Sequence, residues 1–135
     1  MADIRKVTDA FAVAPQMAPG DMPEVAGLGY RLVINNRPDG EVPGQPTSAE
    51  MEAAARAAGL DYIFIPVLGG PTLAQVEAVA DAVAGAEGPV LAFCRSGTRS
   101  INTWSIGQAR SGEPRDELAR LGADAGYDLS GVLGL

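Results

Sequence analysis

The sequence predicts an α/β fold with a mainly parallel central sheet of about four to five strands, flanked by helices. Short runs of β-branched and aliphatic residues alternate along the chain with helical segments of roughly 10 to 15 residues. This alternation favours parallel strands joined by crossover helices that cover both faces of the sheet. A chain of 135 residues is long enough for one core and too short for two, so residues 1–135 are expected to form a single domain.

The first half of the chain contributes two predicted strands. Phe11–Ala14 is a short apolar run, and the segment APGDMPEVAGLG after it suits a short helix bounded by turns. Tyr30–Asn35 is rich in β-branched and aliphatic residues, which predicts a buried strand. The stretch NRPDGEVPGQP that follows contains three prolines and two glycines. It is therefore predicted to be a surface loop at the end of that strand.

The next two elements are a helix and a strand. Residues Thr47–Ala58 are predicted to be helical because Thr47 or Ser48 can cap the helix, its middle is rich in alanine and Gly59 can end it. The apolar run Tyr62–Val67 predicts the strand that follows.

The remaining elements complete the alternation. Pro71–Ala84 is a predicted helix, Pro89–Phe93 a predicted buried strand, and the segment after Arg99 an amphipathic helix. The apolar face of the predicted helix Pro71–Ala84 is expected to consist of Leu73, Val76, Val79, Ala80 and Val83. A last helix is predicted at Pro114–Leu121, and the glycine-rich tail from Gly122 onward carries no assignable pattern.

Charge and composition limit the possible partners. The 10 basic and 17 acidic residues give a net charge of −7, which opposes nonspecific binding to nucleic acid or anionic membranes.

The N-terminus MADIRKVTDAF lacks the apolar segment of a secretory signal, and a single cysteine suits a reducing compartment. A cytoplasmic location is expected. One cysteine, no histidine and scattered carboxylates provide no ligand cluster, so neither a metal nor another cofactor is expected.

The single cysteine, Cys94, marks the candidate site. It stands where the predicted strand Pro89–Phe93 gives way to the polar turn of CRSGTRS. A loop that leads from a strand into a helix directs backbone N–H groups and the positive helix end toward one point, which binds anions and favours a thiolate. A lone cysteine that ends an apolar run is often a packed core residue. The adjacent arginines, hydroxyls and glycine instead favour a nucleophile.

The residues around Cys94 suggest how an anion would be bound. Arg99 can offer a planar fork to the oxygens of a phosphate, sulfate or thiosulfonate. Because the chain has no histidine, a Cys–His pair within one subunit is excluded. Besides the catalytic candidates Cys94 and Arg99, the residues expected to contact the substrate are Arg95, Ser96, Gly97, Thr98, Ser100 and Arg37.

The pattern Cys-x-x-Gly-x-Arg-Ser resembles the phosphate-binding loop of cysteine-dependent phosphatases and the active-site loop of rhodaneses. The succession of VINNRPDGEVPGQP, an alanine-rich helix, IFIPV and GPVLAFCRSGTRS resembles the bacterial beta-lactamase-hydrolase-like family with a phosphatase-like domain, over residues 4–109. That domain occurs alone or fused to a persulfide-oxidising metal enzyme. The resemblance implies a dual-specificity-phosphatase-like fold, a nucleophile at Cys94 and an anion clamp at Arg99. Phosphatase-like and sulfurtransferase-like activities are both described in this family.

Three departures from the phosphatase pattern favour sulfur chemistry. Four residues, rather than five, separate Cys94 from Arg99, which is the spacing of many rhodaneses. Phe93 stands where such phosphatases tend to have histidine. Their general-acid aspartate follows the strand equivalent to IFIPV, where this chain has Leu68, Gly69 and Gly70.

The loop NRPDGE offers candidates for the missing general acid and for substrate binding. Asp39 or Glu41 could act as the acid, or be solvated turn residues, and Arg37 could bind substrate or pair with an acid. Asn35 and Asn36 are expected to bond loop backbone.

The favoured hypothesis is a sulfurtransferase in which Cys94 accepts sulfane sulfur from thiosulfate or glutathione persulfide, holds it as a persulfide and passes it to an external thiol. One alternative is a phosphatase that acts through a Cys94 thiophosphate on phosphoesters, with Asp39 or Glu41 as acid. The other is a noncatalytic sensor of anions or persulfides.

Overall fold

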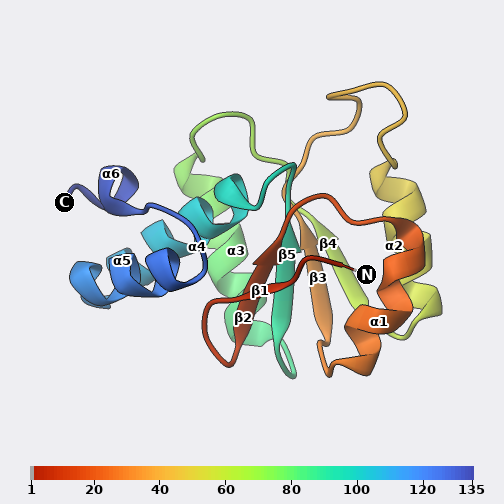
Figure 1. The fold of residues 1–135 in the computed structure, drawn as a ribbon, viewed down its shortest axis with the longest axis horizontal. Coiled ribbons are helices and arrows are strands. Elements are labelled where there is room, and N and C mark those ends of the chain that lie inside the picture. The colour runs from red at the N-terminus through yellow and green to blue at the C-terminus, as the bar shows by residue number, and fades with distance from the viewer. Residues whose placement is uncertain (1) are drawn as a thin grey trace.

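The computed structural model, which describes residues 2–135, has a five-stranded sheet between layers of helices (Figure 1). The strand order is β1-β2-β5-β3-β4. All neighbours pair in parallel except β1, which is antiparallel to β2. The strands are β1 (Arg5–Lys6), β2 (Phe11–Ala14), β3 (Leu32–Asn35), β4 (Asp61–Phe64) and β5 (Val90–Phe93). The predicted α/β fold with a mainly parallel sheet is therefore confirmed.

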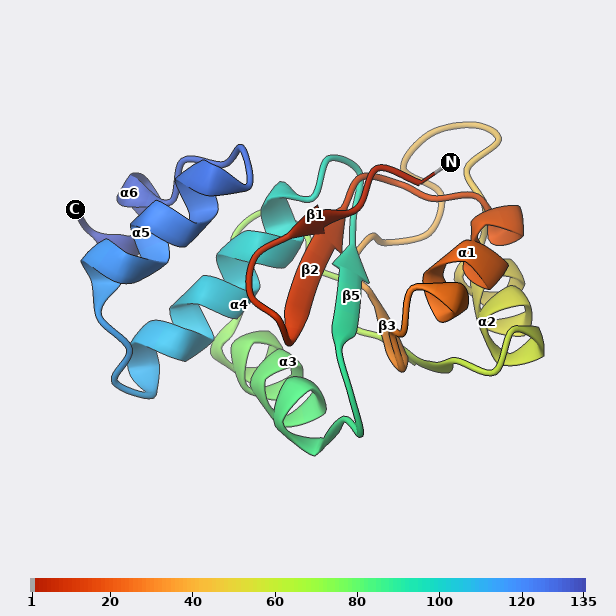
Figure 2. The ribbon, with the colours of Figure 1, turned by 60° about the horizontal axis from the view of Figure 1, so that its bottom comes forward.

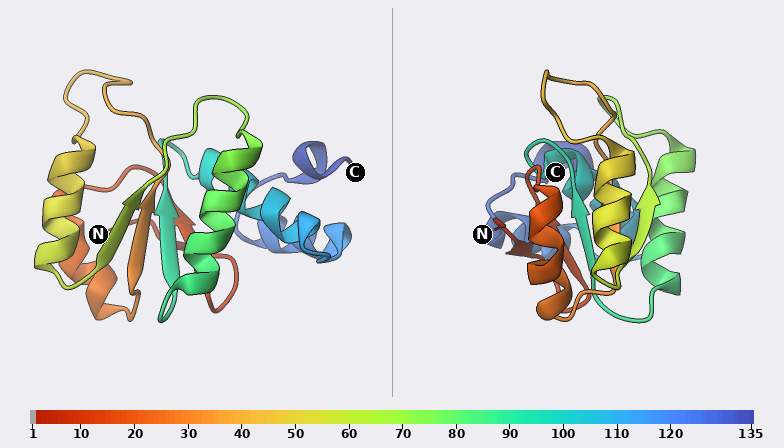
Figure 3. Two further views of the ribbon diagram at one scale, coloured as in Figure 1. Left: turned by 180° about the vertical axis from the view of Figure 1, so that it is seen from behind. Right: turned by 90° about the vertical axis from the view of Figure 1, so that its right-hand side faces the viewer.

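Helices cover both faces of this sheet (Figures 2 and 3). One face carries the short 3-10 turn η1 (Pro19–Asp21) with α1 (Met22–Gly27) and α2 (Ser48–Ala57). The other face carries α3 and α4, and α5 and α6 pack against α4. These four helices are α3 (Leu73–Gly85), α4 (Thr98–Arg110), α5 (Arg115–Asp124) and α6 (Ser130–Leu133).

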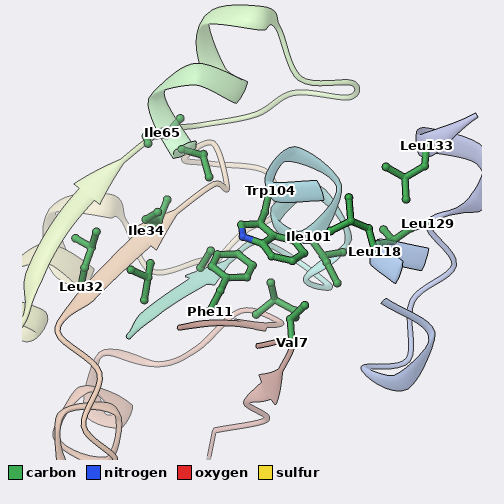
Figure 4. Close-up of a cluster of buried hydrophobic side chains, with 14 residues drawn as sticks. Val7, Phe11, Leu32, Ile34, Ile65, Ile101, Trp104, Leu118, Leu129 and Leu133 are labelled. Atoms are coloured by element: carbon green, nitrogen blue, oxygen red, sulfur yellow. The ribbon is translucent and has the colours of Figure 1, made fainter. Parts of the chain in front are cut away.

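Alternation along the strands produces two apolar cores. In β2, Phe11 and Val13 point into the core under α3 and α4, while Ala12 and Ala14 point into the core under α1 and α2. Phe11 stacks on Trp104 of α4, with ring centroids 4.9 Å apart and planes 6° from parallel (Figure 4). Because both faces are covered, every residue of β2, β3 and β5 is buried.

The predicted helix caps lie close to the observed ones. The backbone N–H of Glu50 donates to the hydroxyl of Thr47, and the Glu50 carboxylate accepts from the Thr47 backbone N–H, so α2 begins with a capping box. Thr72 and Gln75 form the same arrangement at α3, which therefore begins after Thr72 rather than at Pro71. Leu73 was expected on the apolar face of this helix, and that expectation is wrong. It is the first helical residue, beyond the covered surface, and is 54% exposed.

One strand is shorter than expected, and two short elements were not expected from the sequence. The strand expected at Tyr62–Val67 ends at Phe64, because Pro66 has no N–H for a continued ladder. The two-residue strand β1 and the short helix α6 carry no pattern long enough to be read from sequence. None of the helices in residues 2–135 combines the length and the apolar character needed to cross a bilayer.

The carboxyl ends of the four parallel strands meet at one edge of the sheet. The loops of residues 36–47, 65–72 and 94–97 leave the strands there and stand together at the top of Figure 1. Loops from such an edge commonly build ligand sites in parallel sheets.

Candidate active site

Cys94 follows the central strand β5 directly and is fully buried. The backbone N–H of Gly97 donates to its Sγ at 3.1 Å. Gly97 has a φ of +91° and immediately precedes α4, so the loop turns sharply at this residue and enters the helix. The thiol therefore lies at the positive end of a 13-residue helix with a backbone N–H directed at it.

Arg99, in the first turn of α4, is held by the neighbouring loops. Its Nη1 donates to Oε2 of Glu41 at 2.8 Å and to the carbonyl of Val67 at 3.0 Å, and its Nη2 donates to Oε1 of Glu41 at 2.8 Å. A guanidinium has five N–H groups, and these three bonds within residues 2–135 leave two of them, on Nε and on the Nε side of Nη2. These two lie along one edge and form a fork that suits an anion.

Arg99 lies in the first turn of α4, five residues after Cys94, and its charge interacts with that of the cysteine. The pKa of Arg99 is raised mainly by its hydrogen bond to Glu41, and the charge of Cys94 adds to this effect. Cys94 and Arg99 are thus close enough for their charges to interact.

The Glu41 carboxylate accepts hydrogen bonds from two arginines. Besides Arg99, it accepts a hydrogen bond from Nε of Arg37 at 2.9 Å. The side chain of Arg37 is only 4% exposed, and its Nη1 donates to Oε1 of Gln16 at 3.1 Å. The hydrogen bonds from Arg99 and then Arg37 lower the pKa of Glu41 to about 2. Glu41 is therefore a carboxylate at neutral pH and carries no proton to donate.

Asp39, the other candidate acid, contacts the start of a helix. Its Oδ1 accepts a hydrogen bond from the backbone N–H of Ser48 at 2.7 Å. Ser48 is the first residue of α2, where backbone N–H groups have no partner within the helix. In this structure Asp39 therefore stabilises the entry to α2.

The remaining residues of the loop differ in their contacts. Ser96 Oγ donates to Thr98 Oγ1 at 3.0 Å, so these two hydroxyls bond each other. The side chain of Arg95 is exposed, and its carbonyl accepts from the backbone N–H of Gln16 at 3.2 Å. The hydroxyl of Ser100 is buried and has no hydrogen-bond partner within residues 2–135.

The two asparagines at the end of β3 hydrogen-bond to the surrounding backbone, as expected. Asn35 Oδ1 accepts from the backbone N–H of Arg37 at 2.8 Å, and Asn36 Nδ2 donates to the carbonyl of Ile65 at 2.9 Å. These bonds connect the loops after β3 and β4 and fix the point from which Arg37 projects.

Three contributors to the site escape the sequence analysis. They are the Gln16 amide, the carbonyl of Val67 and Tyr127, whose hydroxyl donates to the carbonyl of Ser96 at 2.8 Å. Tyr127 lies 31 residues beyond Ser96 in a segment without a recognisable pattern, so no local signal indicates it. Gln16 follows a predicted strand end, which is the one indication that could have found it.

A surface hollow of about 400 Å³ lies at the opposite edge of the sheet, where β3 and β4 begin. Its arginines are already paired, Arg31 with Glu87 and Arg56 with Glu52. The chemically distinctive groups lie instead around Cys94.

Comparison with known proteins gives related sequences over most of the chain. The chain is 40% identical over 127 residues to the beta-lactamase hydrolase-like protein of Agrobacterium fabrum strain C58, covering 92% of this chain and 29% of that protein. It is 41% identical over 125 residues to the protein of the same description from Xylella fastidiosa strain Temecula1, covering 91% of this chain and 29% of that protein. The chain thus spans less than a third of the length of these curated relatives.

Solved structures agree with this relationship. A candidate phosphatase from Neisseria meningitidis Z2491 superposes with a TM-score of 0.86 at 33% identity, covering 97% of this chain and 94% of that chain. The active form of Tk-PTP has the same fold, with a TM-score of 0.70 at 20% identity over 97% of this chain and 91% of that chain. The family profile of the beta-lactamase hydrolase-like protein, phosphatase-like domain, matches residues 3–111. The chain belongs to this phosphatase-like family.

Proposed function

We propose that the protein is a phosphoric monoester hydrolase with Cys94 as nucleophile. The Cys94 thiolate attacks phosphorus, an S–P bond forms, and the P–O bond to the alcohol breaks. Water then attacks the thiophosphate, which releases inorganic phosphate and restores the thiolate. The observation that carries this proposal is that Cys94, whose Sγ accepts the Gly97 N–H, is followed in the first turn of α4 by Arg99, whose guanidinium is held at one end by Glu41. The phosphatase-like family and the folds of its relatives support it.

The hydrogen-bonding groups suit the charge that develops during this reaction. In the transition state negative charge spreads over the equatorial oxygens of the phosphoryl group. In this proposal the fork of Arg99, the backbone N–H of Gly97 and the buried, unpaired hydroxyl of Ser100 donate hydrogen bonds to these oxygens. Arg37 acts indirectly, since two of its nitrogens are engaged with Glu41 and Gln16.

The state of Glu41 suggests the substrate class. An alkoxide leaving group gains about 10²- to 10⁴-fold from a general acid, and Glu41 is ionised by two arginines. Aryl phosphates need less help because a phenolate is a stable anion. We therefore propose aryl phosphomonoesters, the class that includes phosphotyrosine, as the preferred substrates.

Sulfur transfer is the second candidate, and the spacing of four residues between Cys94 and Arg99 favours it. Here the Cys94 thiolate attacks the outer sulfur of thiosulfate, an S–S bond forms, and sulfite leaves with the electrons of the broken bond. An external thiol then takes the sulfur from the Cys94 persulfide. The family and the related folds support phosphatase chemistry better.

One set of assays distinguishes these candidates. Wild-type protein and Cys94→Ser are compared for turnover of para-nitrophenyl phosphate, thiosulfate and glutathione persulfide, and the mass of Cys94 is followed during each reaction. The proposal predicts phosphate release that Cys94→Ser abolishes, together with a transient phosphorylated mass. A persulfide mass with thiol-dependent turnover would instead establish sulfur transfer. Modification of Cys94 that no acceptor discharges would indicate a sensor.

A further inference from the structure

The peptide unit between Ser96 and Gly97 is bonded at both of its polar ends. Its N–H, from Gly97, donates to Cys94 Sγ at 3.1 Å. Its carbonyl, from Ser96, accepts a hydrogen bond from the hydroxyl of Tyr127 at 2.8 Å. In a trans peptide the carbonyl and the N–H point in opposite directions. Fixing the carbonyl toward Tyr127 therefore directs the N–H toward the sulfur.

This peptide unit needs such a restraint because Gly97 is one of its members. Glycine adopts left-handed and right-handed backbone conformations with similar ease, so the unit can rotate and turn its N–H away from the sulfur. Gly97 is held at a φ of +91°. A Cβ built on it would lie 2.2 Å from the hydroxyl oxygen of Tyr127, which shows how closely the tyrosine rests on the loop.

Tyr127 is itself held in place. It lies between α5 and α6, outside the residues 3–111 that the family profile matches. Its backbone N–H donates to the carbonyl of Gly122 at 2.8 Å, and the guanidinium of Arg5 lies 5.2 Å from the centre of its ring. The hydroxyl is thus presented to Ser96 from a fixed position.

We propose that Tyr127 is a positioning residue for the nucleophile. Its hydroxyl holds the Ser96–Gly97 peptide in the orientation that stabilises the Cys94 thiolate. This inference rests on the proposed role of Cys94 as nucleophile. It adds a residue from the C-terminal segment to the machinery of the site.

The test is the alkylation rate of Cys94 by iodoacetamide, which is unambiguous because the chain has one cysteine. Tyr127→Phe keeps the ring and removes only the hydroxyl. The expected result near neutral pH is a rate about three- to tenfold lower than that of the wild type, the effect of one hydrogen bond on the thiolate population. At strongly alkaline pH, where the thiol is ionised in both proteins, the rates should converge. Replacement of Tyr127 by 4-aminophenylalanine, which keeps a donor, should restore much of the neutral rate.

If Tyr127 only supported the fold of the loop, the alkylation rate of Cys94 would depend on pH in a different way. Because Cys94 is fully buried, a loosened loop would expose it and raise the alkylation rate at every pH, which would overturn the proposal. Equal rates for the two proteins at every pH would also overturn it. Tyr30→Phe is the matched control, since Tyr30 precedes β3, at the opposite edge of the sheet from Cys94, and loss of its hydroxyl should leave the rate unchanged.

Alkylation also separates this inference from the proposed hydrolase activity. Wild-type protein that releases no phosphate would refute the hydrolase, while the pH profile of Tyr127→Phe still reports on the peptide orientation. Conversely, Cys94-dependent phosphate release with an unchanged profile in Tyr127→Phe would refute the role of Tyr127 alone.

Discussion

Both carboxylate oxygens of Glu41 accept hydrogen bonds from the terminal nitrogens of Arg99, each at 2.8 Å, although 58 residues separate the two in sequence. This contact occupies one end of the guanidinium and leaves the edge formed by Nε and Nη2 free. Glu41 thus sets the direction in which Arg99 offers its remaining donors. Arg37 in turn fixes Glu41 from the other side, so the orientation of Arg99 depends on a chain of three charged side chains.

Glu41→Gln is expected to lower kcat/KM for para-nitrophenyl phosphate by about tenfold, because Arg99 loses a charged partner and its fork is less well oriented. The free energy of unfolding should fall by about 1–3 kcal/mol, since Arg37 stays buried without its counter-charge. Steady-state kinetics and urea denaturation measure the two effects.

The matched control for this substitution is Glu87→Gln. Glu87 also pairs with an arginine, but at 3.6 Å, with 82% of its side chain exposed and at the opposite edge of the sheet. Loss of the Glu87 charge should change neither kcat/KM nor the free energy of unfolding appreciably. A higher kcat/KM in Glu41→Gln would contradict the orienting role and show that Glu41 competes with the substrate for Arg99.

The same carboxylate predicts a stability effect at acid pH. Glu41 has a pKa of about 2 in the folded protein against 4.5 for a free side chain, so its contribution to stability is complete above the unfolded pKa. That contribution is lost as pH falls through the folded pKa. The difference in melting temperature between wild type and Glu41→Gln should therefore be largest above pH 4.5 and shrink toward pH 2. A constant difference over this range, measured by calorimetry, would argue against the ion pair as its source.

Gly97→Ala is expected to abolish Cys94-dependent turnover and to lower the free energy of unfolding by about 2–4 kcal/mol. The new Cβ meets both an unfavourable φ of +91° and the hydroxyl of Tyr127 at 2.2 Å. Gly69→Ala is the control, because Gly69 has a φ of +70° with nothing within 4 Å of its added Cβ. It should show only the cost of backbone strain, about 1–2 kcal/mol. Equal losses of stability in both variants would show that contact with Tyr127 is unimportant.

The parts of the structure that sequence predicts are those fixed by local patterns. The apolar run at β2, the capping threonine of α2 and the position of Cys94 between β5 and α4 all follow from residues adjacent in the chain. The pairing of Asn36 with backbone is predicted for the same reason, since a polar residue at a strand end has few other partners.

The parts that sequence misses depend on distant contacts. Glu41 is recognisable as a residue of the right loop, but its role depends on Arg99, which arrives from another strand end. Tyr127 reaches the loop only because α5 and α6 fold back over α4. The short spacing between Cys94 and Arg99 favours sulfur chemistry, whereas the family and related folds support the phosphatase alternative better.

Asp39 provides the final prediction, because it is the candidate acid that remains once Glu41 is ionised. Its carboxylate accepts from the backbone N–H of Ser48 at 2.7 Å, a contact that an asparagine amide oxygen can also make. We expect Asp39→Asn to retain the stability and the aryl phosphatase activity of the wild type. Asp39→Ala should lose about 0.5–2 kcal/mol of stability through the unpaired N–H at the start of α2.

A series of aryl phosphates with progressively more basic leaving groups distinguishes this structural role from acid catalysis. Without an acid, the rate of phosphoenzyme formation should decrease steeply with leaving-group basicity, and to the same extent in wild type and Asp39→Asn. If Asp39 donated the proton, the wild type would show a shallow dependence that becomes steep in Asp39→Asn, because the acid matters most for the poorest leaving groups. Burst kinetics along the series measures both slopes, and a difference between them would assign the acid to Asp39 and extend the substrate class to alkyl phosphates.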